Sequence, residues 1–350
     1  MTRDERGPAP WRLLVTGGAG FIGSAFVRRL LGRDPERPVI VLDKLTYAGN
    51  RSNLESVAGS PGFRFVQGDI ADREVVESLV ADVDAIVNFA AESHVDRSIE
   101  SADAFIRTDV YGTFVLLDAA RRHGHARYLQ VSTDEVYGSL AIGSAREDDR
   151  LDPRSPYAAS KAAGDMLALA FGTTYGLSVG ITRASNTFGP YQYPEKILPL
   201  FATNAIDGQP LPLYGDGQQV RDWLYVDDHC AAVELVLTDG AAGEVYNVAG
   251  DNELTNLELT HLILGELSLP WSLVRSVPDR PGHDRRYSLD ATRIRGLGWR
   301  PEASFPQAIS QTVRWYVDHP EWWRPLKSGE YLEYYRRQYA ERLEESSSIW

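Results

Sequence analysis

Two side chains in the middle of the sequence have the types and the spacing that proton transfer requires. Tyr157 and Lys161 stand four residues apart at the start of a predicted helix, so their side chains share one face. An ammonium group beside a phenol favours the tyrosinate form, and a tyrosine whose pKa falls from about 10 can act as a general base near neutral pH. The same spacing occurs by chance on surface helices, so its meaning depends on the surrounding elements.

A second group with acid–base capacity follows a predicted strand. The stretch VSTDEVYG places two adjacent acids, Asp134 and Glu135, directly after Thr133. Ligands of open α/β sheets bind at the carboxyl ends of strands, which is where these acids lie. Two carboxyl groups there can supply the acid and the base that elimination of water requires. The alternative interpretation is a pair of solvated acids in a turn.

A glycine-rich turn near the start of the chain predicts a dinucleotide site. The apolar strand end Leu13–Thr16 is followed by GGAGFIG, in which Gly17, Gly20 and Gly23 have G-x-x-G-x-x-G spacing, and then by a helical pattern. The first glycine permits a tight turn, the second lets the backbone approach a pyrophosphate, and the third allows close packing of helix on sheet. The N-terminus of the helix then presents N–H groups to the phosphates.

Acidic and small residues at the next strand ends narrow the prediction to NAD. Asp43 ends the second strand twenty residues after the last glycine, where a carboxylate binds both ribose hydroxyls and repels the 2′-phosphate of NADP. Asp69 is expected to contact adenine, with an ordinary strand-end cap as the alternative, while Ala90 and Ala91 leave room for the cofactor. An oxidised nicotinamide near Tyr157 would further lower the pKa of its phenol. The predicted cofactor contacts are Gly17, Gly20, Phe21, Ile22, Gly23, Asp43, Lys44, Asp69, Ile70, Ala90, Ala91, Tyr157 and Lys161.

Short apolar runs alternate with amphipathic segments through the first half of the chain. The runs WRLLVTG, PVIVLDKL, FRFVQGD, DAIVNFA, RYLQVST and LSVGITRAS predict buried strands, and the segments between them predict helices. This alternation is typical of a Rossmann-like α/β fold with a doubly wound parallel sheet. We expect an NAD-binding domain over residues 11–185 with a return segment near 223–240, a smaller C-terminal substrate-binding lobe over 186–318, and a helical tail over 319–350.

Composition excludes several classes of protein. The 350 residues carry a net charge of −13, which speaks against binding of nucleic acid or of anionic membranes. No run of 18 apolar residues predicts a membrane span, and the first residues, a short flexible lead, lack the apolar core of a signal peptide. The single cysteine, Cys230, fits a reducing cytoplasm; a small residue at a helix start is a simpler interpretation than a thiol nucleophile beside His229. No metal site is predicted.

Together these motifs resemble the extended short-chain dehydrogenase/reductase family over about residues 11–318. The resemblance implies that Tyr157 deprotonates a sugar hydroxyl while the nicotinamide C4 accepts a hydride, and that Thr133 orients the same oxygen. A simple epimerase needs only hydride transfer and rotation of the sugar, whereas a dehydratase must also remove the C5 proton and expel the C6 hydroxyl. The adjacent acids Asp134 and Glu135 therefore favour a dehydratase.

Several long segments are similar to those of the dTDP-glucose 4,6-dehydratases, among them DKLTYAGN, STDEVYG, SPYAASKA, GPYQYPEKILPL and DRPGHDRRYSLD. The resemblance implies that Asp134 protonates the departing C6 hydroxyl and Glu135 takes the C5 proton. The implied steps are hydride transfer from C4 to a tightly held NAD+, loss of water across C5–C6, and hydride return to C6, giving the 4-keto-6-deoxyglucose nucleotide for deoxysugar biosynthesis. Three alternatives stay open: a UDP- or GDP-linked 4,6-dehydratase, a nucleotide-sugar 4-epimerase or decarboxylase, and a catalytically silent NAD-sensing protein.

The same resemblance implies which residues hold the nucleotide sugar. Lys196, Arg221 and Arg280 are expected around the nucleotide and its diphosphate, because cationic side chains, and the planar fork of arginine above all, suit phosphate oxygens. The alternative for each is a solvated surface charge. The predicted substrate contacts are His94, Asn186, Glu195, Lys196, Pro212, Tyr214, Arg221, Asn256, Arg280 and His283.

The sequence departs from the usual dehydratase pattern at Asp109, Thr187, Phe188 and Gln192. None of these positions belongs to the predicted catalytic set, so the expected reaction type is unchanged. These departures bear on the choice of nucleotide base, because thymine and uracil differ by one methyl group, which is worth only about 1–3 kcal/mol.

Two predicted helices, TFVLLDAARRHG and SKAAGDMLALAFG, carry more apolar surface than one face of a sheet requires. In the family that the chain resembles, the corresponding helices form a four-helix bundle between two subunits. We therefore expect a homodimer.

Overall fold

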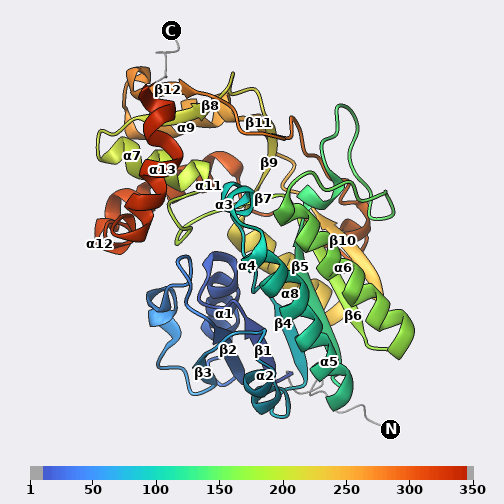
Figure 1. Ribbon diagram of the computed structural model, residues 1–350. Helices are drawn as coiled ribbons and strands as arrows, with labels where there is room; N and C mark the ends of the chain where they lie inside the picture. The colour runs from blue at the N-terminus through green and yellow to red at the C-terminus, as the bar shows by residue number, and fades with distance from the viewer. Residues whose placement is uncertain (1–10, 345–350) are drawn as a thin grey trace.

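The computed structural model describes residues 11–344 and contains a seven-stranded parallel sheet covered by helices (Figure 1). The strand order is β10-β6-β5-β4-β1-β2-β3, which confirms the predicted doubly wound α/β fold. The chain runs from β1 toward β3 on one side and continues from β4 on the other, so the switch point lies between β1 and β4. The strands are β1 (Leu13–Thr16), β2 (Val39–Asp43), β3 (Phe63–Gln67), β4 (Ala85–Asn88), β5 (Arg127–Thr133), β6 (Val179–Ala184) and β10 (Glu244–Val248).

Two apolar cores lie on the two faces of this sheet. Leu13 and Val15 of β1 belong to the core beneath α1 and α8, whereas Leu14 belongs to the core beneath α2, α5 and α6. Because successive side chains of a strand point to opposite faces and both faces are covered, the central strands β1 and β2 are buried and apolar along nearly their whole length. The covering helices are α1 (Phe21–Arg33), α8 (Val226–Asp239), α2 (Arg73–Val80), α5 (Thr113–His123) and α6 (Pro156–Tyr175).

A smaller lobe follows β6 and has its own core around Phe201, Trp223 and Tyr316. It combines a three-stranded sheet, ordered β11-β9-β7, with the strand pair β12-β8 and several helices. The chain returns to the first lobe through α8, which packs on α1, and through β10, a sheet strand that sequence reasoning did not anticipate. The elements are β7 (Asn186–Phe188), α7 (Ile197–Ile206), β8 (Leu211–Tyr214), β9 (Val220–Tyr225), β11 (Glu253–Thr255), α9 (Asn256–Leu267), β12 (Val274–Val277) and α11 (Phe305–Asp318).

Short helices and a long terminal helix complete the described chain. The predicted helical tail contains α12 (Pro320–Trp323) and α13 (Glu330–Glu344), and α13 lies against the smaller lobe in Figure 1. The short N-terminal lead, residues 1–10, and the last tail residues, 345–350, lie outside the described residues. The remaining helices are α3 (Val95–Glu100), α4 (Asp103–Phe105), a π-helical turn over Ile106–Gly112 and α10 (Thr292–Gly296), and the 3-10 turns are Arg51–Val57, Asp134–Tyr137, Trp271–Leu273 and Pro325–Lys327.

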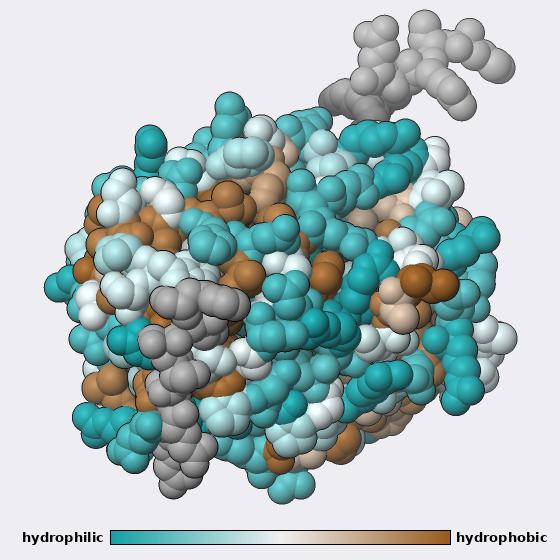
Figure 2. Space-filling model, turned by 90° about the horizontal axis from the view of Figure 1, so that it is seen from above, coloured by the Kyte–Doolittle hydropathy of each residue, from teal (hydrophilic) through white to brown (hydrophobic). Residues whose placement is uncertain are grey.

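Hydrophilic side chains cover much of the face shown in Figure 2, with apolar side chains in patches between them. Within residues 11–344, none of the helices has both the length and the apolar character that a bilayer crossing requires.

Candidate active site

The larger of two adjoining cavities lies at the carboxyl ends of the sheet strands and has a volume of about 330 Å³. Residues that follow β1, β2, β3 and β4 line it, together with residues from the first turns of α1 and α6. Every residue of the predicted cofactor set lines this cavity. The fold thus brings residues that are spread over positions 17–161 together around one cavity. The location agrees with the rule that ligands of open α/β sheets bind at the switch point.

The glycine turn leaves room for a diphosphate beside the sheet. Gly17 has φ of 67°, and a Cβ at this position would stand 2.5 Å from the backbone nitrogen of Ala90. At Gly23, a Cβ would collide with the carbonyl oxygen of Gly17. Helix α1 begins at Phe21 and no side chain caps its N-terminus, so N–H groups of its first turn are free to bind an anion.

Two carboxylates at neighbouring strand ends are held in different ways. Asp43 accepts backbone N–H bonds from Ala19 and Leu45, each at 2.8 Å, and burial raises the pKa of its carboxyl against these bonds. Asp69 forms a 2.9 Å ion pair with Lys44 and also accepts the N–H of Ala71. Asp69 thus makes the turn contact expected of an ordinary strand-end cap, which was the alternative interpretation of this residue. It also lines the cavity. The glycine cradle and the two acids fit the diphosphate, ribose and adenine of NAD.

The tyrosine and lysine come from the first two turns of α6. Ser155 caps this helix by accepting the N–H of Ala158, which fixes Tyr157 at the wall of the cavity. The ammonium of Lys161 donates to the carbonyl oxygen of Val131 at 2.8 Å. Burial, followed by the charge of Glu135, raises the pKa of the Tyr157 phenol well above its ordinary value. We predicted that Lys161 would lower this pKa. For the groups of the protein alone this prediction is wrong, because desolvation and neighbouring carboxylates outweigh any effect of the ammonium.

The acid pair begins the 3-10 turn that follows β5, and its two members have different surroundings. The hydroxyl of Thr133 donates to Asp134 at 3.1 Å and accepts the N–H of Glu135 at 3.2 Å. Asp134 is buried, one of its oxygens has no hydrogen-bond partner, and burial together with Glu135 raises its pKa to about 8. Asp134 therefore keeps its proton at neutral pH. Glu135 lines both cavities, whereas Thr133 and Asp134 lie behind it, outside the residues that line them.

A further acid, at a position where the sequence departs from the family pattern, lies behind the tyrosine. Asp109 belongs to the π-helical turn and accepts the hydroxyl of Ser160 at 2.7 Å and the N–H of Glu92 at 3.0 Å. Burial raises the pKa of its carboxyl to about 7, and its charge in turn raises the pKa of Tyr157. Asp109 therefore places a titratable group next to the base.

The second cavity, of about 120 Å³, adjoins the first, and Asn186, Glu195 and Lys196 line both. Every predicted substrate residue lines this second cavity. Arg280 is partly buried and forms a 3.0 Å ion pair with Asp96, and Arg221 stacks over the ring of Tyr287 at 4.3 Å. The two arginines and Lys196 bring three cationic side chains, which suit phosphate oxygens, to a cavity that the carboxyl groups of Asp96, Glu135 and Glu195 also line.

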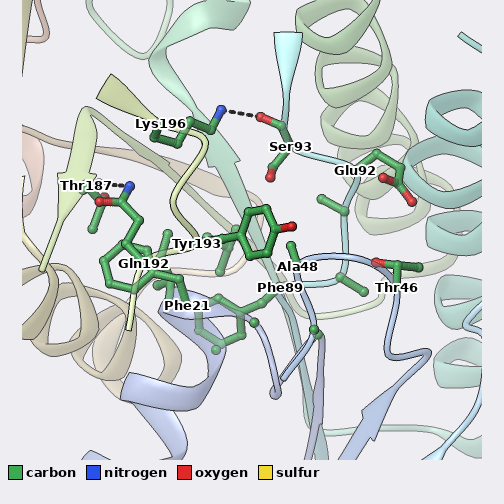
Figure 3. Close-up of a pocket in the computed structure, with 18 of the residues that line it drawn as sticks. Phe21, Thr46, Ala48, Phe89, Glu92, Ser93, Thr187, Gln192, Tyr193 and Lys196 are labelled. Carbon is green, nitrogen blue, oxygen red and sulfur yellow. Dashed lines mark hydrogen bonds between the residues drawn. The ribbon is translucent and has the colours of Figure 1, made fainter. Parts of the chain in front are cut away.

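Several lining residues were absent from the sequence prediction. Glu92 and Ser93 come directly after Ala90 and Ala91 in the loop that follows β4, so extending the strand-end rule by two residues would have found them. Figure 3 shows Lys196 bonded to the carbonyl oxygen of Ser93, and the ring of Tyr193 between Gln192 and Ala48. Tyr193 and Gln192 follow β7 in an irregular segment, where no periodic pattern marks a lining residue.

Two departures from the family pattern meet at one side of the larger cavity. The amide of Gln192 donates to the carbonyl oxygen of Thr187 at 3.0 Å, as Figure 3 shows. The hydroxyl of Thr187 also lies 2.9 Å from Nδ1 of His229. All three side chains line the cavity, while Phe188 is fully buried in the core of the smaller lobe.

A doubly wound sheet with this glycine turn and with a tyrosine–lysine pair at the switch point defines an extended short-chain dehydrogenase/reductase. The model of the GDP-mannose 4,6 dehydratase family matches residues 14–312. The dTDP-glucose 4,6-dehydratase of Streptomyces niveus is 56% identical over 322 residues, which cover 91% of this chain and 96% of that protein. The chain therefore belongs to the nucleotide-sugar 4,6-dehydratase family, in which its relatives include dTDP-glucose 4,6-dehydratases.

Solved structures support the same placement. A dTDP-glucose 4,6-dehydratase from Streptomyces venezuelae, crystallised with NAD, has a TM-score of 0.89 and 57% identity, covering 90% of this chain and all of that chain. The UDP-glucose 4-epimerase of Thermus thermophilus, also solved with NAD, has a TM-score of 0.82 at 33% identity and covers 88% of this chain and 99% of its own. The fold is thus common to both enzyme types and does not by itself choose between them.

Proposed function

We propose that this protein is a hydro-lyase that converts dTDP-glucose into dTDP-4-keto-6-deoxyglucose with a tightly held NAD+. The proposal combines the family membership with the properties of the site. Its relatives at 55–56% identity carry this activity in their names. The larger cavity fits the dinucleotide, and the smaller cavity, with its three cationic side chains, fits the nucleoside diphosphate of the substrate.

The catalytic side chains and the bound cofactor divide the reaction between them. Bound NAD supplies the hydride acceptor for C4 and the hydride that returns to C6. Tyr157 accepts the proton of the 4-hydroxyl, Thr133 orients that oxygen, and Lys161 supports the pair. Glu135, which faces both cavities, removes the C5 proton.

The observation that carries the proposal is the difference between the two members of the acid pair. The carboxyl of Asp134 has a pKa of about 8 because it is buried beside Glu135, so it can donate a proton to the departing C6 hydroxyl at neutral pH. Elimination of water needs such an acid next to a base, and two carboxyl groups with different surroundings supply both. Hydride transfer alone, as in an epimerase, would need neither.

The test is incubation of the purified protein with dTDP-glucose without added NAD, followed by the alkaline absorbance of a 4-keto-6-deoxy product. Product formation supports the reaction and shows that NAD stays bound through the cycle. Product from UDP- or GDP-linked sugars but not from dTDP-glucose would contradict the assigned nucleotide. Absence of product with every nucleotide sugar, even after NAD is added, would refute the dehydratase assignment.

We also propose a cytoplasmic homodimer. Tyr111, Met166 and Tyr175 are exposed on or beside α5 and α6, where the family forms its four-helix bundle. Cys230 is buried, and a single cysteine forms no internal disulfide, which suits a reducing compartment. Sedimentation analysis tests the dimer: a monomer at micromolar concentration would contradict it.

A further inference from the structure

Helix α13 lies outside the residues that the family model matches, yet it packs against the substrate cavity. Its buried face consists of Tyr331, Tyr334, Gln338 and Tyr339, at the spacing of one helical stripe. This stripe covers part of the smaller lobe and also contacts His94, in the loop that follows β4. The tail is therefore a structural neighbour of the site.

The first set of contacts joins α13 to α3 and to His94, the residue that precedes α3. The guanidinium of Arg97 lies between the rings of Tyr47 and Tyr334, at 3.8 and 4.2 Å from their centroids. It also pairs with Glu195 at 3.3 Å, and the hydroxyl of Tyr334 lies 3.4 Å from Nδ1 of His94. His94 and Glu195 both line the substrate cavity, so α13 holds in place a loop that forms its wall.

A second set of contacts leads from α13 to a candidate phosphate ligand. The amide of Gln338 donates to the hydroxyl of Tyr214 at 2.8 Å, and this hydroxyl donates to Asp96 at 3.2 Å. The other oxygen of Asp96 accepts a hydrogen bond from Arg280 at 3.0 Å. A continuous hydrogen-bonded chain thus connects the tail helix to Arg280.

Tyr339 itself lines the substrate cavity, next to Tyr214. The two hydroxyls are 3.5 Å apart and the ring centroids 6.1 Å apart. Glu135 lines both cavities and so lies where they adjoin, whereas Tyr339 lines the smaller cavity alone. Tyr339 therefore lies at the end of the cavity that is remote from the reacting acid. If the sugar reacts beside Glu135 and the arginines hold the diphosphate, this end receives the nucleoside.

We propose that Tyr339 forms a wall of the nucleoside subsite and that α13 positions both this ring and, through Tyr214 and Asp96, Arg280. This inference rests on the proposed function, because it takes a nucleoside diphosphate as the ligand. It makes the C-terminal helix a part of substrate recognition. Tyr339 is then a specificity residue that binds the ligand without taking part in proton or hydride transfer.

The test compares Tyr339→Leu and Tyr339→Phe with Tyr331→Leu, which removes an equally buried tyrosine of the same helix that does not line the substrate cavity. Binding of dTDP, UDP and GDP to the NAD-containing protein is measured by calorimetry, with thermal unfolding in parallel. Tyr339→Leu should weaken binding of the preferred diphosphate about tenfold, the scale of an aromatic contact. Tyr339→Phe should restore the affinity, and Tyr331→Leu should affect unfolding alone. The KM should rise in Tyr339→Leu while kcat stays unchanged.

The two proposals fail in different ways. If the wild type binds UDP or GDP but not dTDP, the assigned nucleotide is wrong, and the same variants then test the subsite with the diphosphate that binds. Unchanged affinity in a folded Tyr339→Leu variant overturns the role of Tyr339. Equal loss of affinity in Tyr331→Leu also overturns it, because the effect would then be one of helix stability. If Tyr339→Leu fails to fold, the affinity of Tyr339→Phe for the diphosphate serves as the test. A tenfold loss of affinity in this variant, which keeps the aromatic ring, overturns the proposed contact with the ring.

Discussion

The cofactor cavity and the substrate cavity are built from different parts of the chain. Backbone geometry shapes much of the first: the turn at Gly17 and the uncapped start of α1 both act through main-chain atoms. Side chains from distant segments shape the second, where Asp96 meets Arg280 and Tyr339 meets Tyr214. A backbone cradle tolerates few substitutions but accepts the same dinucleotide in many enzymes, whereas a wall of side chains can change its ligand by single replacements.

Two buried acids, Asp43 and Asp134, show the same contrast between backbone and side-chain surroundings. The carboxylate of Asp43 accepts two backbone N–H groups, which oppose the rise of its pKa and keep it suited to bind ribose hydroxyls. Asp134 has the hydroxyl of Thr133 as its hydrogen-bond partner and one oxygen without a partner, so burial dominates. Burial alone does not set the function of an acid; the donors around it decide whether it serves as an anion or as a proton donor.

The largest effect is expected from Asp134→Asn, which removes the proton donor and leaves the cofactor cavity intact. Turnover of dTDP-glucose should fall about 10²–10⁴-fold, the usual contribution of a general acid. Oxidation at C4 does not use Asp134, so reduced nicotinamide should accumulate and is measured by its near-ultraviolet absorbance. Turnover at the wild-type rate would contradict the role of Asp134.

The same variant should gain stability relative to the wild type as the pH rises. The folded-state pKa of Asp134, about 8, lies above its ordinary value of 3.8, so the stability that its protonated form contributes is present below about pH 4 and is lost as the pH rises through 8. Asparagine does not ionise, so the unfolding temperature of the variant should fall less than that of the wild type over this range. Parallel curves for the two proteins would be inconsistent with a raised pKa.

Gly17→Ala tests the backbone-built cavity. The new methyl would stand 2.5 Å from the backbone nitrogen of Ala90, in a residue with φ of 67°, so NAD content after purification and the unfolding temperature should both fall. Gly124→Ala is the matched control, because Gly124 has φ of 66° but no surrounding atom within 4 Å of the place that a Cβ would take. It should show only the strain of the left-handed conformation, about 1–2 kcal/mol, with full NAD content. Equal NAD loss in both variants would exclude the steric explanation.

The smallest effect is expected from Asp109→Asn, at a buried position next to Tyr157 of the larger cavity. Ionisation of Asp109, with a pKa of about 7, raises the pKa of the Tyr157 phenol. Removing this charge should therefore move the acidic limb of the kcat/KM profile to lower pH, by less than about one unit. A shift to higher pH would mean that Asp109 supports the ionised tyrosine by another route.

Local sequence patterns predicted the cofactor half well, because each of its signals lies within one strand–turn–helix unit. Gly17, Gly20 and Gly23 share such a unit, and Tyr157 and Lys161 share one helix face. The protein's own groups raise the pKa of Tyr157, where Lys161 was predicted to lower it, since this pKa depends on burial and on carboxylates that come from other strands and helices. The strand β10 was also missed, because GEVYNV is short and lies far along the chain from the sheet that it joins.

The sequence by itself determined the sheet, the glycine cradle and the identities of the acids, since these depend on residue type and on spacing within one element. Tertiary structure alone decided which acid keeps its proton, because the pKa of Asp134 depends on how completely the fold removes it from water. It also decided that Tyr339 lines the substrate cavity. No spacing rule connects a tail helix to the loop after β4; only packing of the folded chain brings them into contact.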